Sequence, residues 1–166
     1  MTSELLPVLN ELHVRLIESR QTVSVAESCT GGLLGAALTE CSGSSAYFLG
    51  GVQAYANSVK EELLGVSHET LLSFGAVSEE VASEMALGIQ RLTGSDWALS
   101  TTGIAGPDGG TDEKPVGTVW VSVADSDGVY SQKLALDGTR SEIRDCTVVE
   151  ALSMLLERLS DDDDDL

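Results

Sequence analysis

The chain has 166 residues, of which 42% are hydrophobic and 22% are charged, and its formal net charge at pH 7 is −18. This length and composition suit one globular domain with a single sizeable core. The acidic balance argues against a nucleic-acid-binding protein, because binding to phosphates needs clustered Lys and Arg. No apolar run approaches the length of a bilayer span, so we expect a cytoplasmic protein with neither nucleic acid nor membrane as a partner.

Hydrophobic periodicity predicts alternating helices and strands in the first half of the chain. The opening segment is typical of an amphipathic helix rather than of a signal peptide. Asn57 is the expected N-cap of a short helix that follows the second strand. The predicted elements are, in order, a helix at about 3–20, a strand at 22–26, a helix at 30–40, a strand at 50–57 and the short helix at 59–66.

Helix caps and a hairpin signal mark the elements of the second half. Ser67 and Ser78 are the expected N-caps of two helices, the second of which should end at Gly94. A final helix is expected to begin near Thr139, which opens a capping-box pattern. Three strands are predicted before that helix, the last two joined by a hairpin turn: 96–103, 117–125 and 129–137.

The order of these elements predicts an α/β fold, a three-layer α/β/α sandwich around a mixed, mostly parallel sheet. We see neither an internal repeat nor a domain boundary, so residues 1–159 are expected to form one domain. The closing aspartate run, residues 160–166, is a like-charge block that favours a disordered, solubilising tail. An odd number of cysteines without a CxxC pair favours free thiols over disulfides or a zinc site; they are Cys29, Cys41 and Cys146.

The stretch VSVAESCTGGLLGAAL, residues 23–38, passes from strand to helix through a turn of small residues. The turn contains two side chains that can act as nucleophiles, Ser28 and Cys29. Unpaired N–H groups at the start of a helix suit a bound anion or a developing oxyanion. A tight connection with an ordinary helix cap is equally compatible with these residues, so the stretch alone leaves both interpretations open.

A serine or cysteine nucleophile needs a base, and histidine is the usual one. His13 and His68, the two histidines, are expected at the surface or at a cap, because neither lies beside a glycine turn. Lys60 follows Tyr55 by five residues, where a strand turns into a helix. Parallel strands bring their carboxyl ends to one sheet edge, so both side chains could face Ser28. A desolvated lysine can act as the base, whereas a lysine in water at a helix start is the plain alternative.

A third segment, STTGIAGPDGGTDEKPVGTVW at 100–120, is rich in glycine and leaves a predicted strand at its carboxyl end. Glycine lets backbone amides approach a ligand closely. The segment lacks the closing GK[ST] of a phosphate-binding P-loop and the spacing of a dinucleotide fingerprint. By itself it is weak evidence for a ligand site.

The segments AESCTGG, GSSAYFLGGVQAYANSVKEELLGV, GAVSEE and TGIAGPDGGTDEKPVGTVW together resemble the CinA carboxyl-terminal family, the bacterial nicotinamide mononucleotide amidohydrolases. The resemblance covers residues 22–158, and its glycine loop is highly specific. It implies hydrolysis of the nicotinamide carboxamide to nicotinic acid mononucleotide and ammonia, as a step of pyridine nucleotide recycling. It also implies a fold related to anticodon-binding-like α/β/α sandwiches.

The same resemblance assigns roles to individual residues. The family often has Gly-Asp-Arg before its last helix, whereas this chain has Gly138-Thr139-Arg140, so only the role of the arginine carries over. The residues expected to be catalytic are Ser28, Ser45, Tyr55 and Lys60. The residues expected to bind the substrate are Thr30, Gly31, Thr102, Gly103, Gly106 and Arg140.

The chemistry and the resemblance join in one mechanism. Ser28 or Ser45 attacks the carboxamide carbon and Lys60 takes the proton, with Ser28 favoured by its place in the turn. Tyr55 orients the lysine or relays a proton to the departing ammonia. Arg140 holds the substrate phosphate. This mechanism needs no metal or other cofactor.

We further expect a small-molecule nucleotide as the substrate, a homo-oligomer as the assembly, and Cys29 as a packing residue rather than the nucleophile. The alternative function is a non-catalytic nucleotide-binding or regulatory module tied to competence or DNA damage. Four residues argue against this alternative, because a binding module needs neither a nucleophile nor a base: Ser28, Ser45, Tyr55 and Lys60.

Overall fold

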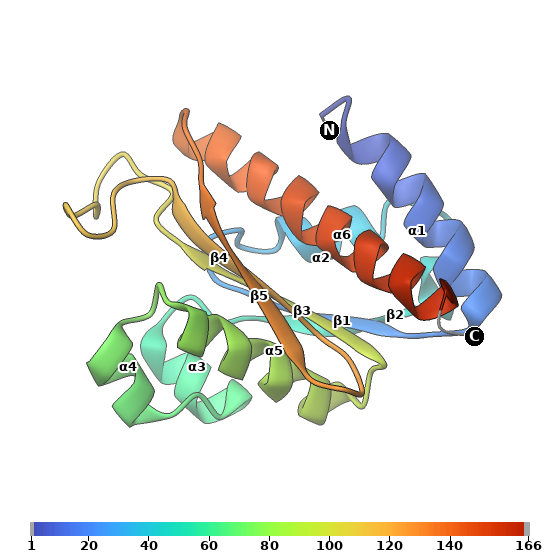
Figure 1. The fold of residues 1–166 in the computed structure, drawn as a ribbon, viewed down its shortest axis with the longest axis horizontal. Coiled ribbons are helices and arrows are strands. Elements are labelled where there is room, and N and C mark those ends of the chain that lie inside the picture. Colours follow the sequence, from blue (N-terminus) through green and yellow to red (C-terminus); the bar gives the residue numbers. More distant parts are fainter. Residues whose placement is uncertain (1, 165–166) are drawn as a thin grey trace.

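One five-stranded sheet runs through the molecule in a computed structural model that describes residues 2–164 (Figure 1). Its strands are β1 Val23–Glu27, β2 Phe48–Gln53, β3 Trp97–Gly103, β4 Thr118–Ala124 and β5 Val129–Ala135. They lie in the order β2-β1-β3-β4-β5. β1 pairs in parallel with β2 and β3, whereas β4 pairs antiparallel with β3 and β5. Since only β4 opposes the other strands, the predicted mixed, mostly parallel sheet is confirmed.

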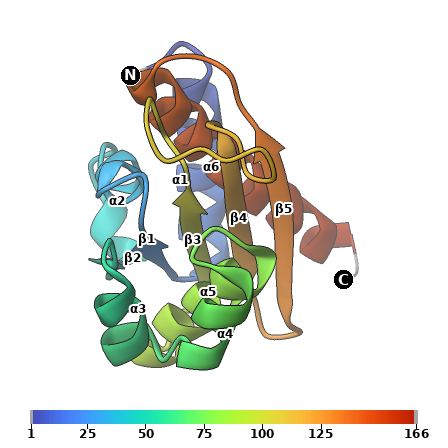
Figure 2. The ribbon, with the colours of Figure 1, turned by 90° about the vertical axis from the view of Figure 1, so that its left-hand side faces the viewer.

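Helices cover both faces of this sheet, as Figures 1 and 2 show. The helices are α1 Leu5–Ser19, α2 Leu33–Leu38, α3 Asn57–Leu64, α4 His68–Phe74, α5 Glu79–Thr93 and α6 Arg140–Asp164, with a short 3-10 helix η1 at Ser44–Ala46. α1, α2 and α6 lie on one face, and α3, α4 and α5 lie on the other (Figure 1). The predicted three-layer α/β/α sandwich is therefore confirmed.

The aspartate run begins as part of α6 in the structure, and the expectation of a disordered tail stays a prediction. The helix extends through Asp164, and residues 165–166 lie outside the described residues. Leu155 and Leu159 anchor this end of the helix in the core. Extending a formed helix costs far less free energy than starting one, so the helix continues into the aspartates.

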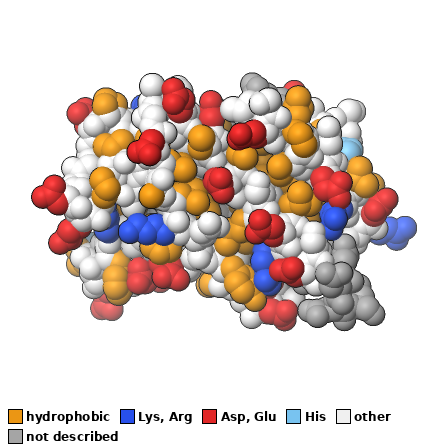
Figure 3. All heavy atoms as spheres, turned by 45° about the horizontal axis from the view of Figure 1, so that its top comes forward, with side chains coloured by type: hydrophobic (Ala, Val, Ile, Leu, Met, Phe, Trp, Pro, Cys, Tyr) orange, Lys and Arg blue, Asp and Glu red, His pale blue; other side chains and the backbone are white. Residues whose placement is uncertain are grey.

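The surface carries the acidic character of the composition. Asp and Glu side chains spread over the face in Figure 3, with few Lys and Arg among them. Such a surface repels the phosphates of nucleic acids at long range. Within the described part of the chain, no helix has both the length and the apolar character that crossing a bilayer requires.

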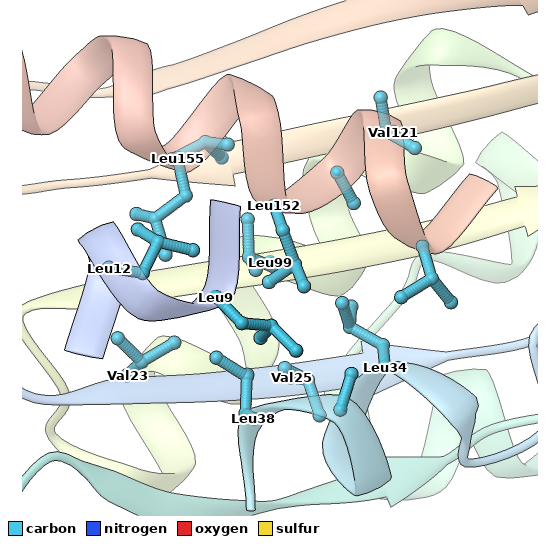
Figure 4. Close-up of a cluster of buried hydrophobic side chains, with 14 of the residues drawn as sticks. Leu9, Leu12, Val23, Val25, Leu34, Leu38, Leu99, Val121, Leu152 and Leu155 are labelled. Carbon is cyan, nitrogen blue, oxygen red and sulfur yellow. The ribbon is translucent and has the colours of Figure 1, made fainter. Parts of the chain in front are cut away.

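Each face of the sheet has its own hydrophobic cluster. On one face, α1 packs Leu9 and Leu12 and α6 packs Leu152 against the β1 side chains Val23 and Val25 (Figure 4). The other cluster combines small strand residues with longer α5 side chains: Ala26, Ala98, Ala124, Val81, Met85 and Ile89. Because packing on both faces fixes the position of the sheet, it also fixes the starting points of the loops at the sheet edges.

Most helix caps agree with the predictions. Ser67 and Ser78 are the N-caps of α4 and α5, and Gly94 ends α5. The Ser78 hydroxyl accepts a hydrogen bond from the Val81 N–H at 3.3 Å, which satisfies one free donor at the start of the helix. The prediction for α3 is wrong by one position, because Asn57 is its first helical residue and Ala56 its N-cap.

Two shifted boundaries leave longer turns than the sequence predicted. α2 begins at Leu33 instead of near residue 30, and residues 28–32 form a turn. β2 ends at Gln53, so Tyr55 lies in the connection to α3 rather than in the strand. The Ala54 N–H still donates to the Glu27 carbonyl at 2.7 Å, which holds this connection beside β1. Both turns therefore begin at the same edge of the sheet.

Candidate active site

The carboxyl ends of the parallel strands β1, β2 and β3 meet at one edge of the sheet. Ser28 directly follows β1, Tyr55 lies just beyond β2, and Thr102 lies near the end of β3. These turns, the glycine-rich loop and the start of α6 border a cleft of about 280 Å³. The expected site residues that line it are Ser28, Tyr55, Lys60, Thr102, Gly103, Gly106 and Arg140.

The side chain of Lys60 is buried and reaches Ser28. Lys60 is 1% exposed and Ser28 is 9% exposed. Lys60 Nζ lies 3.1 Å from Ser28 Oγ, and it donates hydrogen bonds to the carbonyl oxygens of Ala54 at 2.8 Å and Tyr55 at 3.0 Å. The turn between β2 and α3 supplies both carbonyls, so it fixes the direction of the lysine. The predicted base thus contacts one of the two predicted nucleophiles.

Burial lowers the pKa of Lys60, because the charged form has lost its water. A smaller coulombic contribution from Cys29 raises it. Within the described residues, Lys60 forms no salt bridge that would hold it in the charged form. In a neutral amine, two N–H bonds can serve the two carbonyls while the lone pair faces the Ser28 hydroxyl. This geometry suits proton transfer from Ser28 to Lys60.

A buried carboxylate holds the turn that carries Ser28. Glu27 Oε1 accepts hydrogen bonds from Thr30 Oγ1 at 2.7 Å and from the Leu34 N–H at 2.8 Å. Thr30 is fully buried, and its hydroxyl also lies 2.7 Å from Thr101 Oγ1. Thr30 was expected to bind the substrate, but it is not among the residues that line the cleft. Its contacts instead fix the turn from inside the protein.

Two of the glycines that were expected to bind the substrate have backbone conformations in which glycine is favoured. Gly31 has a φ of +58° and Gly106 a φ of +76°, a region that residues with a Cβ disfavour. Gly106 lines the cleft, whereas Gly31 is exposed and is not among the residues that line the cleft. The Thr102 hydroxyl donates to the Ala76 carbonyl at 2.8 Å. Thr102 therefore joins the end of β3 to the segment before α5 and holds that wall of the cleft.

Cys29, the other nucleophile-capable residue of the turn, packs in the core at 6% exposure. Burial raises the pKa of its thiol to about 11. The thiol therefore keeps its proton at neutral pH and is a poor nucleophile. Cys41 and Cys146 are also unpaired, so the expectation of free thiols is confirmed.

Arg140 is the first residue of α6 and borders the cleft. Its Nη1 donates to the Gly106 carbonyl at 2.8 Å, and its Nη2 donates to the Tyr55 hydroxyl at 3.2 Å. Both partners are uncharged, and no carboxylate in the described part of the chain forms a salt bridge with this guanidinium. Its positive charge therefore remains available to an anionic ligand.

Ser45 lies at the opposite end of the sheet. It belongs to η1, which leads into β2, and the first residue of β2, Phe48, pairs with Val23 at the start of β1. Ser28 follows the other end of β1. The length of this strand separates the two ends by about 15 Å at roughly 3.3 Å per residue. A single chain does not bring Ser45 to Lys60, so the catalytic role expected for Ser45 has no support in this geometry.

The two histidines and the exposed lysine of β5 lie elsewhere. His13 Nδ1 lies 3.1 Å from the Tyr47 hydroxyl, and His68 Nδ1 lies 2.8 Å from Glu61 Oε1. Lys133 is exposed on β5, at an edge of the sheet. None of these three side chains lines the cleft.

Two residues around the turn were missed from the sequence, Glu27 and Arg144. An acidic residue at the end of a buried strand was an available signal for Glu27. Arg144 Nε donates to the Cys29 carbonyl at 3.0 Å, and its Nη2 donates to the Thr30 carbonyl at 3.1 Å. The only signal for Arg144 was its position four residues after Arg140, one helical turn along the same face.

Comparisons with known proteins agree with this fold. The chain is 53% identical over 148 residues to a CinA-like protein of Gloeothece citriformis, covering 87% of this chain and 36% of that protein. It is 56% identical over 147 residues to a CinA-like protein of a Synechococcus species, covering 87% of this chain and 35% of that protein. The chain thus spans about a third of the length of these curated relatives.

Solved structures match over nearly their whole length. The competence/damage inducible protein CihA of Agrobacterium tumefaciens has a TM-score of 0.92 and 41% identity, covering 96% of this chain and 98% of that chain. The competence damage-inducible protein A of Klebsiella pneumoniae has a TM-score of 0.91 and 34% identity, with the same coverage of 96% and 98%. Residues 6–159 match the CinA C-terminal domain, and the chain belongs to that family.

Proposed function

We propose that this domain hydrolyses the carboxamide of nicotinamide mononucleotide, giving nicotinic acid mononucleotide and ammonia. The observation that carries the proposal is the 3.1 Å contact between Lys60 Nζ and Ser28 Oγ at a cleft. The motifs that resemble the amidohydrolases suggest the substrate. A guanidinium without a carboxylate partner at the same cleft, Arg140, is suited to the phosphate of that substrate.

The first half of the reaction forms an ester on Ser28. Ser28 Oγ bonds to the carboxamide carbon while its proton passes to Lys60 Nζ. The carbonyl double bond opens, and the negative charge collects on an oxygen that backbone N–H groups of the turn can stabilise. When the double bond forms again, the C–N bond breaks and the proton on Lys60 passes to the nitrogen, which leaves as ammonia.

The second half uses the same lysine with water as the nucleophile. Water attacks the ester carbon and gives a proton to Lys60, and the bond to Ser28 Oγ breaks as that oxygen takes the proton back. The acid product ionises in solution. In this scheme Tyr55 acts at two points, since its backbone carbonyl orients Lys60 and its hydroxyl contacts Arg140.

Release of ammonia from nicotinamide mononucleotide by the purified protein tests this proposal. We expect turnover by the wild-type chain and none above background by Ser28→Ala, which serves as the matched control. The competence and damage names of similar structures suggest a regulatory nucleotide-binding module as the second candidate. Binding of the mononucleotide with no release of ammonia would favour that module.

Two expectations about the setting of the protein stay predictions. A homo-oligomer would give a molar mass above 17.4 kDa in sedimentation or light scattering of the purified chain. A cytoplasmic location would place the protein with its nucleotide substrate, and cell fractionation tests it.

A further inference from the structure

The backbone N–H group of Gly103, the last residue of β3, points away from β4. Successive residues of a strand direct their backbone groups to opposite neighbours, so every second N–H faces the same neighbouring strand. The Ile104 N–H donates to the Thr118 carbonyl at 2.9 Å, which directs residue 104 toward β4. Gly103, one residue earlier, therefore directs its N–H toward the β1 side of β3.

Ser28 lies on this same side of β3. The Ser28 N–H donates to the Thr101 carbonyl at 2.9 Å, two residues before Gly103. A regular parallel ladder would continue with the Gly103 N–H donating to the Ser28 carbonyl. The chain turns at this point instead, and the Ser28 carbonyl accepts from the Gly31 N–H at 3.1 Å. The Gly103 N–H thus faces Ser28 without the acceptor that a regular ladder would supply.

This free donor opens into the cleft. No described residue accepts a hydrogen bond from the Gly103 N–H. Gly103 is half-buried and lines the same cleft as Ser28 and Lys60. Since each backbone N–H in a folded protein needs a partner, this donor is satisfied by what enters the cleft. The N–H of Ser28 itself is already used in its bond to β3, so it does not compete for the same acceptor.

The sheet fixes the direction of this donor before a substrate binds. Thr102 pairs with Trp120 of β4, so its carbonyl faces β4, and in a trans peptide the following N–H points the opposite way. A Cβ at position 103 would lie 2.6 Å from Val119 Cγ2, so glycine lets β4 pack closely against this peptide. A donor that is fixed in advance stabilises a developing negative charge without the cost of reorienting.

We propose that the Gly103 N–H binds the carboxamide oxygen when Ser28 attacks the carboxamide carbon. This inference rests on the proposed amide hydrolysis, and it adds a catalytic contact from β3 to those of the Ser28 turn. As the bond from Ser28 Oγ to carbon forms, an electron pair of the carbonyl moves to the oxygen, and the hydrogen bond from Gly103 strengthens with that charge. The contact therefore acts on the transition state, and its loss should lower kcat more than it raises KM.

The first test removes the N–H and adds no side chain. Replacing Gly103 by glycolic acid through semisynthesis turns the amide into an ester, whose oxygen cannot donate. We expect kcat for ammonia release to fall by about 10²- to 10³-fold, the usual cost of losing one oxyanion donor, with little change in KM. The matched control is glycolic acid at Gly43, which is exposed and does not line the cleft. The control should leave both constants within about twofold of the wild type.

The second test uses the unaltered chain and needs no substrate. A fluorophosphonate reacts with an activated serine: the bond from Ser28 Oγ to phosphorus forms, the serine proton passes to Lys60, and fluoride leaves. The phosphoryl oxygen then occupies the position of the oxyanion. In protein made with isotope-labelled glycine, the NMR signal of the Gly103 amide proton should move downfield, because it then donates to a strongly polar oxygen. The Gly43 amide is the control and should not move.

The two readouts separate failure of this contact from failure of the proposed substrate. A downfield Gly103 amide in a phosphonylated protein that releases no ammonia would reject the proposed substrate and keep Gly103 as the oxyanion donor. Ammonia release with an unmoved Gly103 amide, or with wild-type kcat in the folded Gly103 ester, would overturn the role of Gly103. If the ester variant does not fold, the amide shift alone decides. A wild-type protein that neither releases ammonia nor reacts at Ser28 would overturn both proposals.

Discussion

Two ends of the same sheet carry the two serines that the sequence marked as nucleophiles, and they differ in what surrounds each hydroxyl. At the carboxyl end, Ser28 is 9% exposed and contacts a lysine that is 1% exposed. At the amino end, Ser45 is exposed in η1. Tyr47, two residues later, has its hydroxyl 3.1 Å from His13 Nδ1. In the proposed mechanism, the buried lysine beside Ser28, more than the residue type, is what makes Ser28 a nucleophile and leaves Ser45 an ordinary serine.

Removing each hydroxyl in turn should give the largest difference between Ser28 and Ser45. Ser28→Ala should lower kcat by about 10³-fold or more, because loss of the nucleophile prevents formation of the ester. Ser45→Ala, its matched control, should stay within about twofold of the wild type, as a change at an exposed surface position. Steady-state kinetics of ammonia release measure both. A large loss in Ser45→Ala with a mild effect in Ser28→Ala would reverse the roles of the two ends.

Removing the base should have the next largest effect. Lys60→Met keeps a side chain of similar length and should lower kcat by about 10²- to 10⁴-fold, the usual contribution of a general base. The fold should persist, because the apolar replacement fills the same space. Thermal unfolding and kinetics check both points, with Lys133→Met as the control on an exposed lysine. Substantial turnover in a folded Lys60→Met protein would contradict the assignment.

The pH profile of kcat/KM distinguishes the buried Lys60 from a lysine in water. In the proposed mechanism the neutral amine is the base, so kcat/KM should rise about tenfold per pH unit until the pKa of Lys60 is passed. Burial lowers this pKa, so the plateau should begin below pH 10.5, the value of an ordinary lysine. Ser45→Ala should share the profile of the wild type, whereas residual activity of Lys60→Met should lack this rise. A wild-type profile that is flat or falls with pH would contradict a neutral lysine as the base.

The smallest expected effect concerns Arg140 at the rim of the carboxyl end. Arg140→Ala should raise KM for the mononucleotide by about tenfold, since it removes a charge-assisted contact at an exposed position. The ratio of kcat/KM for the mononucleotide to kcat/KM for free nicotinamide should decrease, because free nicotinamide has no phosphate for Arg140 to contact. Kinetics with both substrates measure this change, and Arg91→Ala is the control. An unchanged preference in Arg140→Ala would show that this arginine does not bind the phosphate.

Much of the fold was predictable because strand and helix periods, caps and glycines act locally. The caps at Ser67, Ser78 and Gly94 depend on a few neighbouring residues, and all three agree with the structure. The end of β2 and the start of α2 were shifted, because the contacts that decide them come from β1 and from Glu27. The extension of α6 into the acidic residues could not be predicted from their charge, because the packing that supports the helix lies upstream of them.

The candidate site was predictable only in part. That Ser28 and Lys60 would share a sheet edge followed from parallel strands, but their direct contact depends on the carbonyls of Ala54 and Tyr55. Ser45 matched a motif as well as Ser28 did, and only the direction of β2 separates the two. The role of Arg144 could not be predicted, because its partners are backbone carbonyls, which have no sequence signature.

The covalent intermediate should be located on Ser28. The wild-type protein would be mixed with nicotinamide mononucleotide, quenched in acid within the first turnover, digested and examined by mass spectrometry. A serine nucleophile at the carboxyl end of the sheet predicts an ester of the nicotinic acid mononucleotide on the peptide that contains Ser28. An ester on the peptide that contains Ser45, or an unmodified Ser28 peptide throughout turnover, would show that Ser28 is not the nucleophile.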